Sequence, residues 1–136
     1  MQENPELIVI DTNIWISFLI TNRYKKLENL LIENEIIILF SEELLLEFSE
    51  VINRPKFKKY FSEIDVEELL NSLGNYIKFI EVNSKVSICR DPKDNFLLSL
   101  SLDGNADYLI TGDKDLLEIK KISDTKIITI SEFLNK

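Results

Sequence analysis

Near its start the chain carries the stretch Leu7-Ile8-Val9-Ile10-Asp11-Thr12-Asn13. Four consecutive apolar, β-prone residues without polar alternation are typical of a central strand that is covered on both faces of a parallel sheet. A carboxylate follows at once, and Asp, Thr and Asn can each cap a helix that begins after them. Ligands bind at the carboxyl ends of the strands in an open parallel sheet, so we expect Asp11 at a ligand-binding edge.

The same alternation of strands and helices continues along the chain. Further strands are predicted at residues 36–40, 79–82, 108–111 and 126–129. Helices are predicted at residues 14–19, 26–32, 65–73 (capped by Asp65) and 96–102, from Ser41 to before Pro55, and from Ser131 onward. This spacing predicts an α/β fold, a three-layer α/β/α arrangement with a central, mainly parallel five-stranded sheet. With 136 residues and no linker or repeat, residues 1–136 are expected to form a single domain.

The composition excludes several kinds of chemistry. The chain has no histidine, which removes Ser–His and Cys–His nucleophile pairs and the usual zinc ligands. The single cysteine, Cys89, cannot form an internal disulfide and is expected to be a small core residue. The longest apolar run, residues 36–40, is too short to span a membrane, and residues 1–6 lack a secretory signal, so a cytoplasmic location without membrane association is expected.

Charge is distributed unevenly. The net charge of −8 argues against nucleic-acid binding through global charge. Two local clusters of cations remain, Arg54-Pro55-Lys56-Phe57-Lys58-Lys59 and Arg23-Tyr24-Lys25-Lys26. Each could be either a solvated end of a helix or loop, or a local binding surface.

Four acidic residues, far apart in the chain, each fall where this fold would bring them to one place. They are Asp11 after the first strand, Glu47 in the helix that follows Ser41, Asp94 before helix 96–102, and Asp113 just after strand 108–111. Carboxylates gathered there would repel one another by roughly 4 kcal/mol per pair at about 4 Å and an effective dielectric near 20. Such a cluster persists if a cation neutralises it or if some members take up protons. A divalent-metal site is the sharper option, and oxygen ligands alone favour magnesium, manganese or calcium and phosphoryl chemistry.

Simpler structural explanations exist for three of these acids. Asp11 could be a plain N-cap, and Glu47 could be a surface glutamate. Glu47 nevertheless lies one turn after Glu43 and one turn before Val51, on the side of the helix that leans on the sheet. Asp94 would already be explained as the N-cap of an apolar helix.

Two further acids compete with Asp94 and Asp113 for the same roles. Asp91 precedes Pro92 and lies three residues before Asp94, which we favour because it opens the helix. Asp115 is close to Asp113, which we favour because it follows the strand directly after Thr111-Gly112.

With these residues in view, the sequence resembles the PIN-domain family, and within it the VapC-like toxin components of prokaryotic toxin–antitoxin pairs. The resemblance covers essentially the whole chain. It rests on Val9-Ile10-Asp11-Thr12-Asn13, on Ser41 with Glu47, on Asp91-Pro92-Lys93-Asp94-Asn95, and on Ala106-Asp107-Tyr108-Leu109-Ile110-Thr111-Gly112-Asp113. The family's four acidic positions fall on Asp11, Glu47, Asp94 and Asp113.

The resemblance implies a metal-dependent endoribonuclease that hydrolyses RNA phosphodiester bonds and acts as the toxin of a toxin–antitoxin pair. The four acids would be the catalytic residues and would hold Mg²⁺ or Mn²⁺. Contacts to the phosphate or to groups around the metal are expected from Thr12, Asn13, Thr111 and, as rivals of the favoured acids, Asp91 and Asp115. Expected partners are RNA, a cognate antitoxin protein and a second copy of the chain in a homodimer.

Other functions are also compatible with parts of this pattern. A PIN-like nuclease could process RNA without any antitoxin, and the same surface could serve a non-catalytic protein-interaction module. A receiver domain would need adjacent acids after the first strand, and an aspartate-nucleophile phosphatase would need Asp where the chain has Asn13. Both of these fit poorly.

Overall fold

Six short strands form one sheet in the computed structural model, which describes residues 5–21 and 24–135. The strands are β1 (Leu7–Ile10), β2 (Ile37–Phe40), β3 (Ile77–Phe79), β4 (Tyr108–Ile110), β5 (Lys121–Ile122) and β6 (Thr125–Ile128). Their order is β3-β2-β1-β4-β6-β5, and every neighbouring pair is parallel except β5 with β6. The predicted α/β class with a mainly parallel central sheet is confirmed.

Two strands differ from the prediction. The sheet of the described residues has six strands rather than five because β5 adds a two-residue antiparallel edge, with Ile122 opposite Thr125. Two residues are too few to show an apolar period. The third strand lies earlier than the predicted 79–82, since β3 pairs with β2 from Ile77 to Phe79 and the chain then leaves the sheet.

Seven α-helices and three short 3₁₀ turns accompany the sheet within the described ranges. They are α1 (Thr12–Thr21), α2 (Lys25–Asn34), α3 (Glu42–Ile52), η1 (Pro55–Phe57), α4 (Glu63–Leu73), η2 (Gly74–Tyr76), η3 (Pro92–Asp94), α5 (Asn95–Asp103), α6 (Lys114–Leu117) and α7 (Ile130–Leu134). The predicted cap of α3 is confirmed, because Ser41 Oγ accepts from Leu44 N at 3.2 Å. The predicted cap of α4 is wrong. Ser62 caps α4, and Asp65 lies inside the helix and completes a capping box with Ser62.

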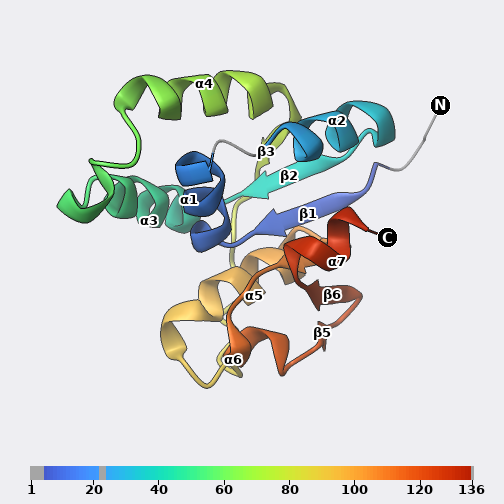
Figure 1. Cartoon of the computed structure of the whole chain (residues 1–136). Coiled ribbons are helices and arrows are strands. Elements are labelled where there is room, and N and C mark those ends of the chain that lie inside the picture. The colour runs from blue at the N-terminus through green and yellow to red at the C-terminus, as the bar shows by residue number, and fades with distance from the viewer. Residues whose placement is uncertain (1–4, 22–23, 136) are drawn as a thin grey trace.

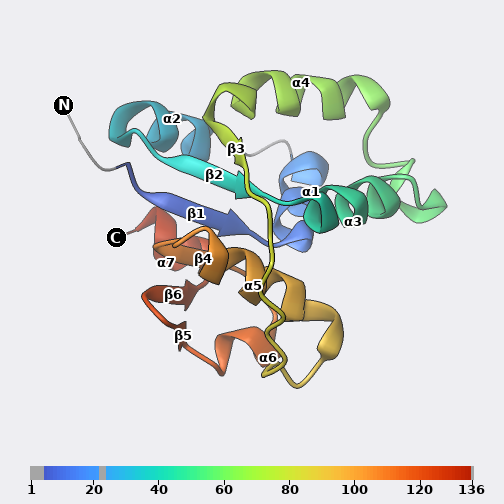
Figure 2. The same cartoon turned by 180° about the vertical axis from the view of Figure 1, so that it is seen from behind.

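The helices cover both faces of the sheet, as the two opposite views show (Figures 1 and 2). One face carries α1, α2 and α7, and the other carries α3 and α5. The irregular segment 80–91 runs along α5, where Val86 N donates to Ser99 Oγ and Cys89 N donates to Asn95 Oδ1. Among the described helices, none has the length and apolar character needed to cross a bilayer.

The core includes both central strands, β1 and β4. Ile8, Val9 and Ile10 of β1 have no solvent exposure, and Trp15 of α1 packs against three phenylalanine rings, those of Phe18, Phe40 and Phe48. Burying each of these large side chains contributes about 1.5–3 kcal/mol. Cys89 is buried, as predicted. The carboxyl end of β1 is therefore held in a rigid surrounding.

The order of the strands identifies one special edge. From β1 the chain adds β2 and β3 on one side of the sheet, and it then crosses to add β4 and β6 on the other side. Ligand sites of open α/β sheets lie at the carboxyl ends of the strands that flank such a reversal. A site is therefore expected between the ends of β1 and β4, which are followed by Asp11 and by Thr111.

Candidate functional site

The ends of β1 and β4 are joined by a pair of side chains. Ile10 lies opposite Ile110 in the parallel register, and Asp11 N donates to Ile110 O at 3.0 Å. The Thr111 hydroxyl donates to Asp11 Oδ2 at 2.7 Å. Both side chains are buried, Asp11 to 5% exposure and Thr111 completely. The first predicted acid therefore sits at the predicted edge of the sheet.

The position of Asp113 depends on the same threonine, Thr111. Its backbone N–H donates to Thr111 Oγ1 at 3.0 Å, and its Oδ1 accepts from Asp115 N at 2.8 Å, which caps α6. One hydroxyl thus fixes Asp11 by donating to it and fixes the Asp113 backbone by accepting from it. Gly112 between them has no positive φ and open space around its missing Cβ, so this turn does not depend on the backbone freedom of glycine.

Asp94 brings a third carboxylate to the site from η3 and α5. It occupies the N-cap position of α5, but its side chain makes no capping hydrogen bond. Its Oδ2 is shielded from solvent and has no hydrogen-bond partner among the described residues. The explanation of Asp94 as a simple helix cap therefore does not hold.

The three aspartates influence one another electrically. Burial, followed by the negative charges of Asp113 and Asp11, raises the pKa of Asp94 to about 7. Burial also raises the pKa of Asp11, and hydrogen bonds from Thr111 and Asn13 offset part of that effect. Raised carboxyl pKa values are the signature of like charges held together in a partly dry place. Of the four predicted acids, Asp11, Asp94 and Asp113 are thus close enough to act on one another through their charge.

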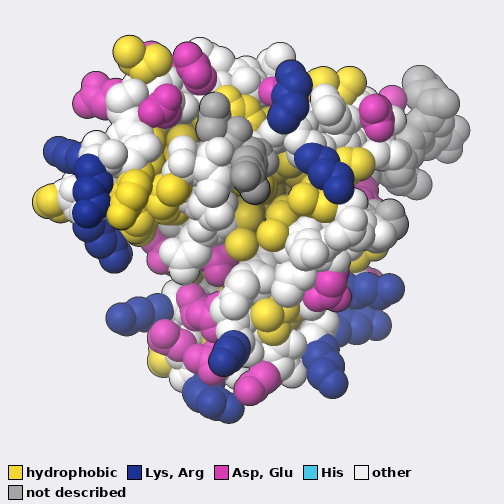
Figure 3. Space-filling view, viewed as in Figure 1, with side chains coloured by type: hydrophobic (Ala, Val, Ile, Leu, Met, Phe, Trp, Pro, Cys, Tyr) yellow, Lys and Arg dark blue, Asp and Glu magenta, His cyan; other side chains and the backbone are white. Residues whose placement is uncertain are grey.

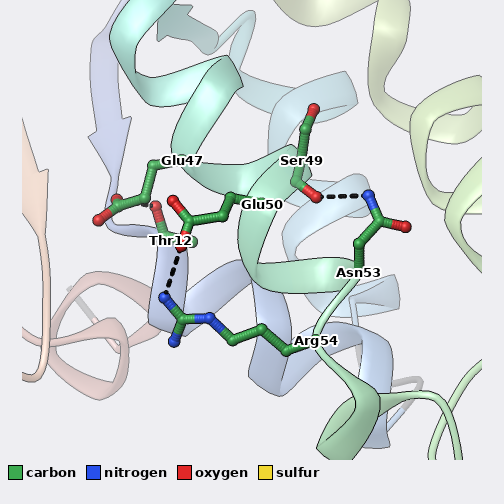
Figure 4. Close-up of polar contacts among 6 residues, drawn as sticks. All are labelled: Thr12, Glu47, Ser49, Glu50, Asn53 and Arg54. Atoms are coloured by element: carbon green, nitrogen blue, oxygen red, sulfur yellow. Dashed lines mark hydrogen bonds and ion pairs between the residues drawn. The ribbon is translucent and has the colours of Figure 1, made fainter.

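Glu47 joins the site through α1 rather than through the other acids. It is half-buried on α3, and its Oε2 accepts a 2.5 Å hydrogen bond from the hydroxyl of Thr12, the residue after Asp11. Figure 4 shows this glutamate and Thr12 side by side. A solvated surface glutamate would have no such bond to a buried threonine. Through Thr12, the neighbour of Asp11 in the chain, Glu47 is linked to the border of the cluster.

The remaining candidates have other roles in the structure. Asp91 caps η3 by accepting from Lys93 N at 3.1 Å, and Asp115 forms a 3.7 Å ion pair with Arg90. The Asn13 side chain is exposed, and its backbone N–H donates to Asp11 Oδ1 at 3.3 Å. Arg90 was not identified from the sequence. The sequence shows no more than that this cation directly precedes the run Asp91-Pro92-Lys93-Asp94.

The donor chemistry of the cluster fits a hard divalent cation. Every candidate ligand is a carboxylate, and the orphaned Asp94 Oδ2 is the kind of atom that a cation would satisfy. Within residues 5–21 and 24–135, no three side chains of the usual ligand types are spaced to grip a single ion as they stand. Binding would therefore involve bridging water or a change of rotamer. Figure 3 shows acidic side chains gathered where α1 and α3 meet α5 and α6.

Comparison with known proteins gives the family. Residues 7–115 match the PIN domain family. The uncharacterized protein MJ1680 of Methanocaldococcus jannaschii is 31% identical over 140 aligned positions, which cover 95% of this chain and 90% of the relative.

Two solved structures share the fold. The VapBC2 structure from Rickettsia felis, bound to a DNA fragment from its promoter, matches with a TM-score of 0.60 at 19% identity, covering 89% of this chain and 96% of that one. PAE2754 from Pyrobaculum aerophilum matches with a TM-score of 0.57 at 16% identity, covering 96% and 88% of the two chains. At these identities the structures speak for the fold alone, whereas the family match spans most of the sequence. The chain belongs to the PIN domain family.

Proposed function

We propose that this protein is a metal-dependent endoribonuclease that hydrolyses RNA phosphodiester bonds. PIN domains are generally nucleases. The observation that carries the proposal is the meeting of Asp11, Asp94 and Asp113 beside the reversal of strand order, with one shielded carboxylate oxygen left unpaired. Three carboxylates held close together in a partly buried place repel one another and destabilise the fold. A bound cation would remove this repulsion, which is why we propose that the site binds one.

Asp11, Asp94 and Asp113 would hold Mg²⁺ or Mn²⁺, and Glu47 would take part from the border of the site through water. The bound metal would lower the pKa of a water molecule and stabilise charge on the leaving oxygen. Thr111 keeps Asp11 oriented by its 2.7 Å hydrogen bond. Thr12 and Asn13 open α1 beside Asp11, so the amino end of that helix is suited to an approaching phosphate group.

The biological role that we propose is that of the toxin in a toxin–antitoxin pair. The Rickettsia felis structure is a VapBC2 assembly, and the shared fold supports a comparable protein partner for this chain. We further propose that the protein is cytoplasmic and homodimeric, and that its 136 residues form one nuclease domain. Co-expression with the product of a neighbouring small reading frame tests the role. If that product forms no complex and leaves RNA cleavage unchanged, the chain is an RNA-processing nuclease instead.

An RNA-degradation assay tests the catalytic proposal directly. The wild-type protein should cleave RNA with Mg²⁺ or Mn²⁺ and lose that activity in excess EDTA. Asp94→Asn and Asp113→Asn should each reduce cleavage by at least a hundredfold while circular dichroism shows an intact fold. Asp124→Asn is the matched control, since this exposed aspartate lies in the turn between β5 and β6, at the edge of the sheet. Full activity in both site variants, or no metal-dependent cleavage by the wild type, would contradict the proposal.

A further inference from the structure

A strongly basic segment lies outside the acidic site. It spans residues 54–61 and is called the basic segment below. Its cations are Arg54, Lys56, Lys58 and Lys59, all of them exposed, and it contains no acid. A local charge of +4 stands out in a chain whose net charge is −8. A polyanion can therefore approach this surface even though the protein as a whole repels it.

Aromatic rings alternate with these cations. Lys56 Nζ lies 5.0 Å from the centre of the Phe57 ring, and Lys59 Nζ lies 5.2 Å from the centre of the Tyr60 ring. Phe57 stacks on Phe61 with ring centres 6.3 Å apart and planes at 19°, and the buried Phe61 anchors the turn. Tyr60 is 53% exposed. The segment thus presents the exposed Tyr60 ring to solvent with an ammonium group over it.

Helix α3 connects the basic segment to the acidic site. Glu47 and Glu50 lie three residues apart on α3, and Arg54, two residues past the end of that helix, pairs through its Nη2 with Glu50 Oε1 at 3.1 Å (Figure 4). Five residues at about 1.5 Å each separate Glu47 from Ile52, the last residue of α3, by about 7.5 Å, and the basic segment begins two residues later. In Figure 3 the Lys and Arg side chains at the left, over the turn after α3, lie on the same face of the molecule as the acidic side chains. A single strand a few nucleotides long can cover both.

We propose that the basic segment binds single-stranded RNA and delivers it to the acidic site. The inference rests on the proposed ribonuclease function and names the surface by which this acidic protein holds its substrate. Cations that follow the phosphates, combined with rings on which bases stack, are the features of surfaces that bind single strands without strict sequence preference. An acidic peptide would pair with the lysines but would leave the Tyr60 ring without a stacking partner.

Binding measured without cleavage tests the lysines. A fluorescein-labelled 12-nucleotide oligouridylate is titrated with protein in EDTA, and anisotropy gives the Kd. The triple variant Lys56→Gln, Lys58→Gln, Lys59→Gln should bind at least tenfold more weakly, and the slope of log K against log salt should fall by about 2. The matched control replaces three exposed lysines around β5 and β6, at positions 120, 121 and 126, by Gln. It carries the same change in net charge and should bind within about twofold of wild type.

A second pair of variants tests the ring. Tyr60→Ala should weaken binding of the oligouridylate by roughly tenfold, whereas Tyr60→Phe should retain it. Phe79→Ala is the control, because Phe79 is a comparably exposed aromatic residue (60%) on β3. It should leave the Kd unchanged.

Several outcomes would overturn the inference. The first is a wild-type protein that does not bind the oligouridylate, and the second is an equal loss of binding affinity in both triple variants. The third is displacement of the RNA by an equally charged 12-residue polyglutamate, which would indicate an acidic protein partner. A wild type that cleaves RNA while the lysine variant binds and cleaves equally well contradicts this inference alone. A wild type that binds RNA through the basic segment but never cleaves it contradicts the ribonuclease proposal alone.

Discussion

The hydroxyl of Thr111, the residue after β4, donates to the carboxylate of Asp11, the residue after β1, at 2.7 Å. The same oxygen accepts a hydrogen bond from the backbone N–H of Asp113. A single buried side chain therefore holds two of the three clustered aspartates in place. Because the hydroxyl favours the ionised form of Asp11, it partly offsets the effect of burial on that pKa. The arrangement explains how two segments a hundred residues apart keep one geometry.

Replacing Thr111 by Val should damage both the fold and the activity. Valine keeps the branched shape but removes the donor to Asp11 and the acceptor for Asp113, and we expect a loss of about 1–3 kcal/mol in the free energy of unfolding. Thr111→Ser should retain most of both properties. Urea denaturation and RNA cleavage are the measurements.

Thr125→Val is the matched control for that prediction. Thr125 is also buried, and its hydroxyl donates to Ala106 O at 2.6 Å, away from the acids. This variant should lose comparable stability but keep its rate of cleavage under conditions where it is folded. If Thr111→Val behaves in the same way, Thr111 serves the fold only.

Asp94→Asn should stabilise the metal-free protein. The substitution removes a charge that Asp113 and Asp11 oppose, and a neutral amide can donate to a neighbouring carboxylate. We expect the Tm in EDTA to rise by a few degrees at pH 8. Adding Mg²⁺ should raise the Tm of the wild type more than that of the variant. A lower Tm in EDTA would mean that the Asp94 carboxylate is needed by the fold.

The raised pKa of Asp94 also predicts how stability depends on pH. Between the ordinary value of 3.8 and about 7, the folded state binds more protons at Asp94 than the unfolded state does. The slope of stability against pH is set by protons bound in the unfolded state minus those in the folded state, so this group makes stability fall as pH rises through that window. Above about pH 7 its effect is complete.

Chemical denaturation in EDTA between pH 5 and pH 8 checks this prediction. The quantity to compare is the difference in unfolding free energy between wild type and Asp94→Asn, because the groups that do not interact with Asp94 cancel in it. That difference should grow in favour of the variant as pH rises and then level off. A difference that stays constant across the range would place the Asp94 pKa near its ordinary value.

Part of this site could be predicted from sequence because its signals are local. The apolar run before Asp11 fixes a buried strand, and the first polar residue after such a strand must lie at the edge of the sheet. The same reasoning applies to Asp113 after β4. The positions of two of the three clustered carboxylates, Asp11 and Asp113, could thus be predicted from the sequence, because each follows a buried strand of a parallel sheet.

The rest depends on contacts that no short stretch contains. The order of the strands places β4 beside β1, and this order follows from how the whole chain packs. Asp94 resembles an N-cap in sequence, and only the structure shows its missing capping bond and unpaired oxygen. The pair of Arg90 with Asp115 joins segment 80–91 to α6 and has no sequence pattern at all. The strand β5 has two residues and is too short to show a sequence pattern.

The same distinction between local pattern and tertiary contact leads to a prediction about two glycines. A Cβ on Gly104 would lie 2.5 Å from Leu39 Cδ1 on β2 and 3.1 Å from Leu100 O, whereas a Cβ on Gly112 would meet nothing within 4 Å. Gly104→Ala should therefore cost about 1–3 kcal/mol of stability, because Leu39 is fully buried and has little room to move. Gly112→Ala should unfold at the same urea concentration as wild type. Equal midpoints for the two variants would show that α5 can shift away from β2, and the close packing of α5 that positions Asp94 would then not be rigid.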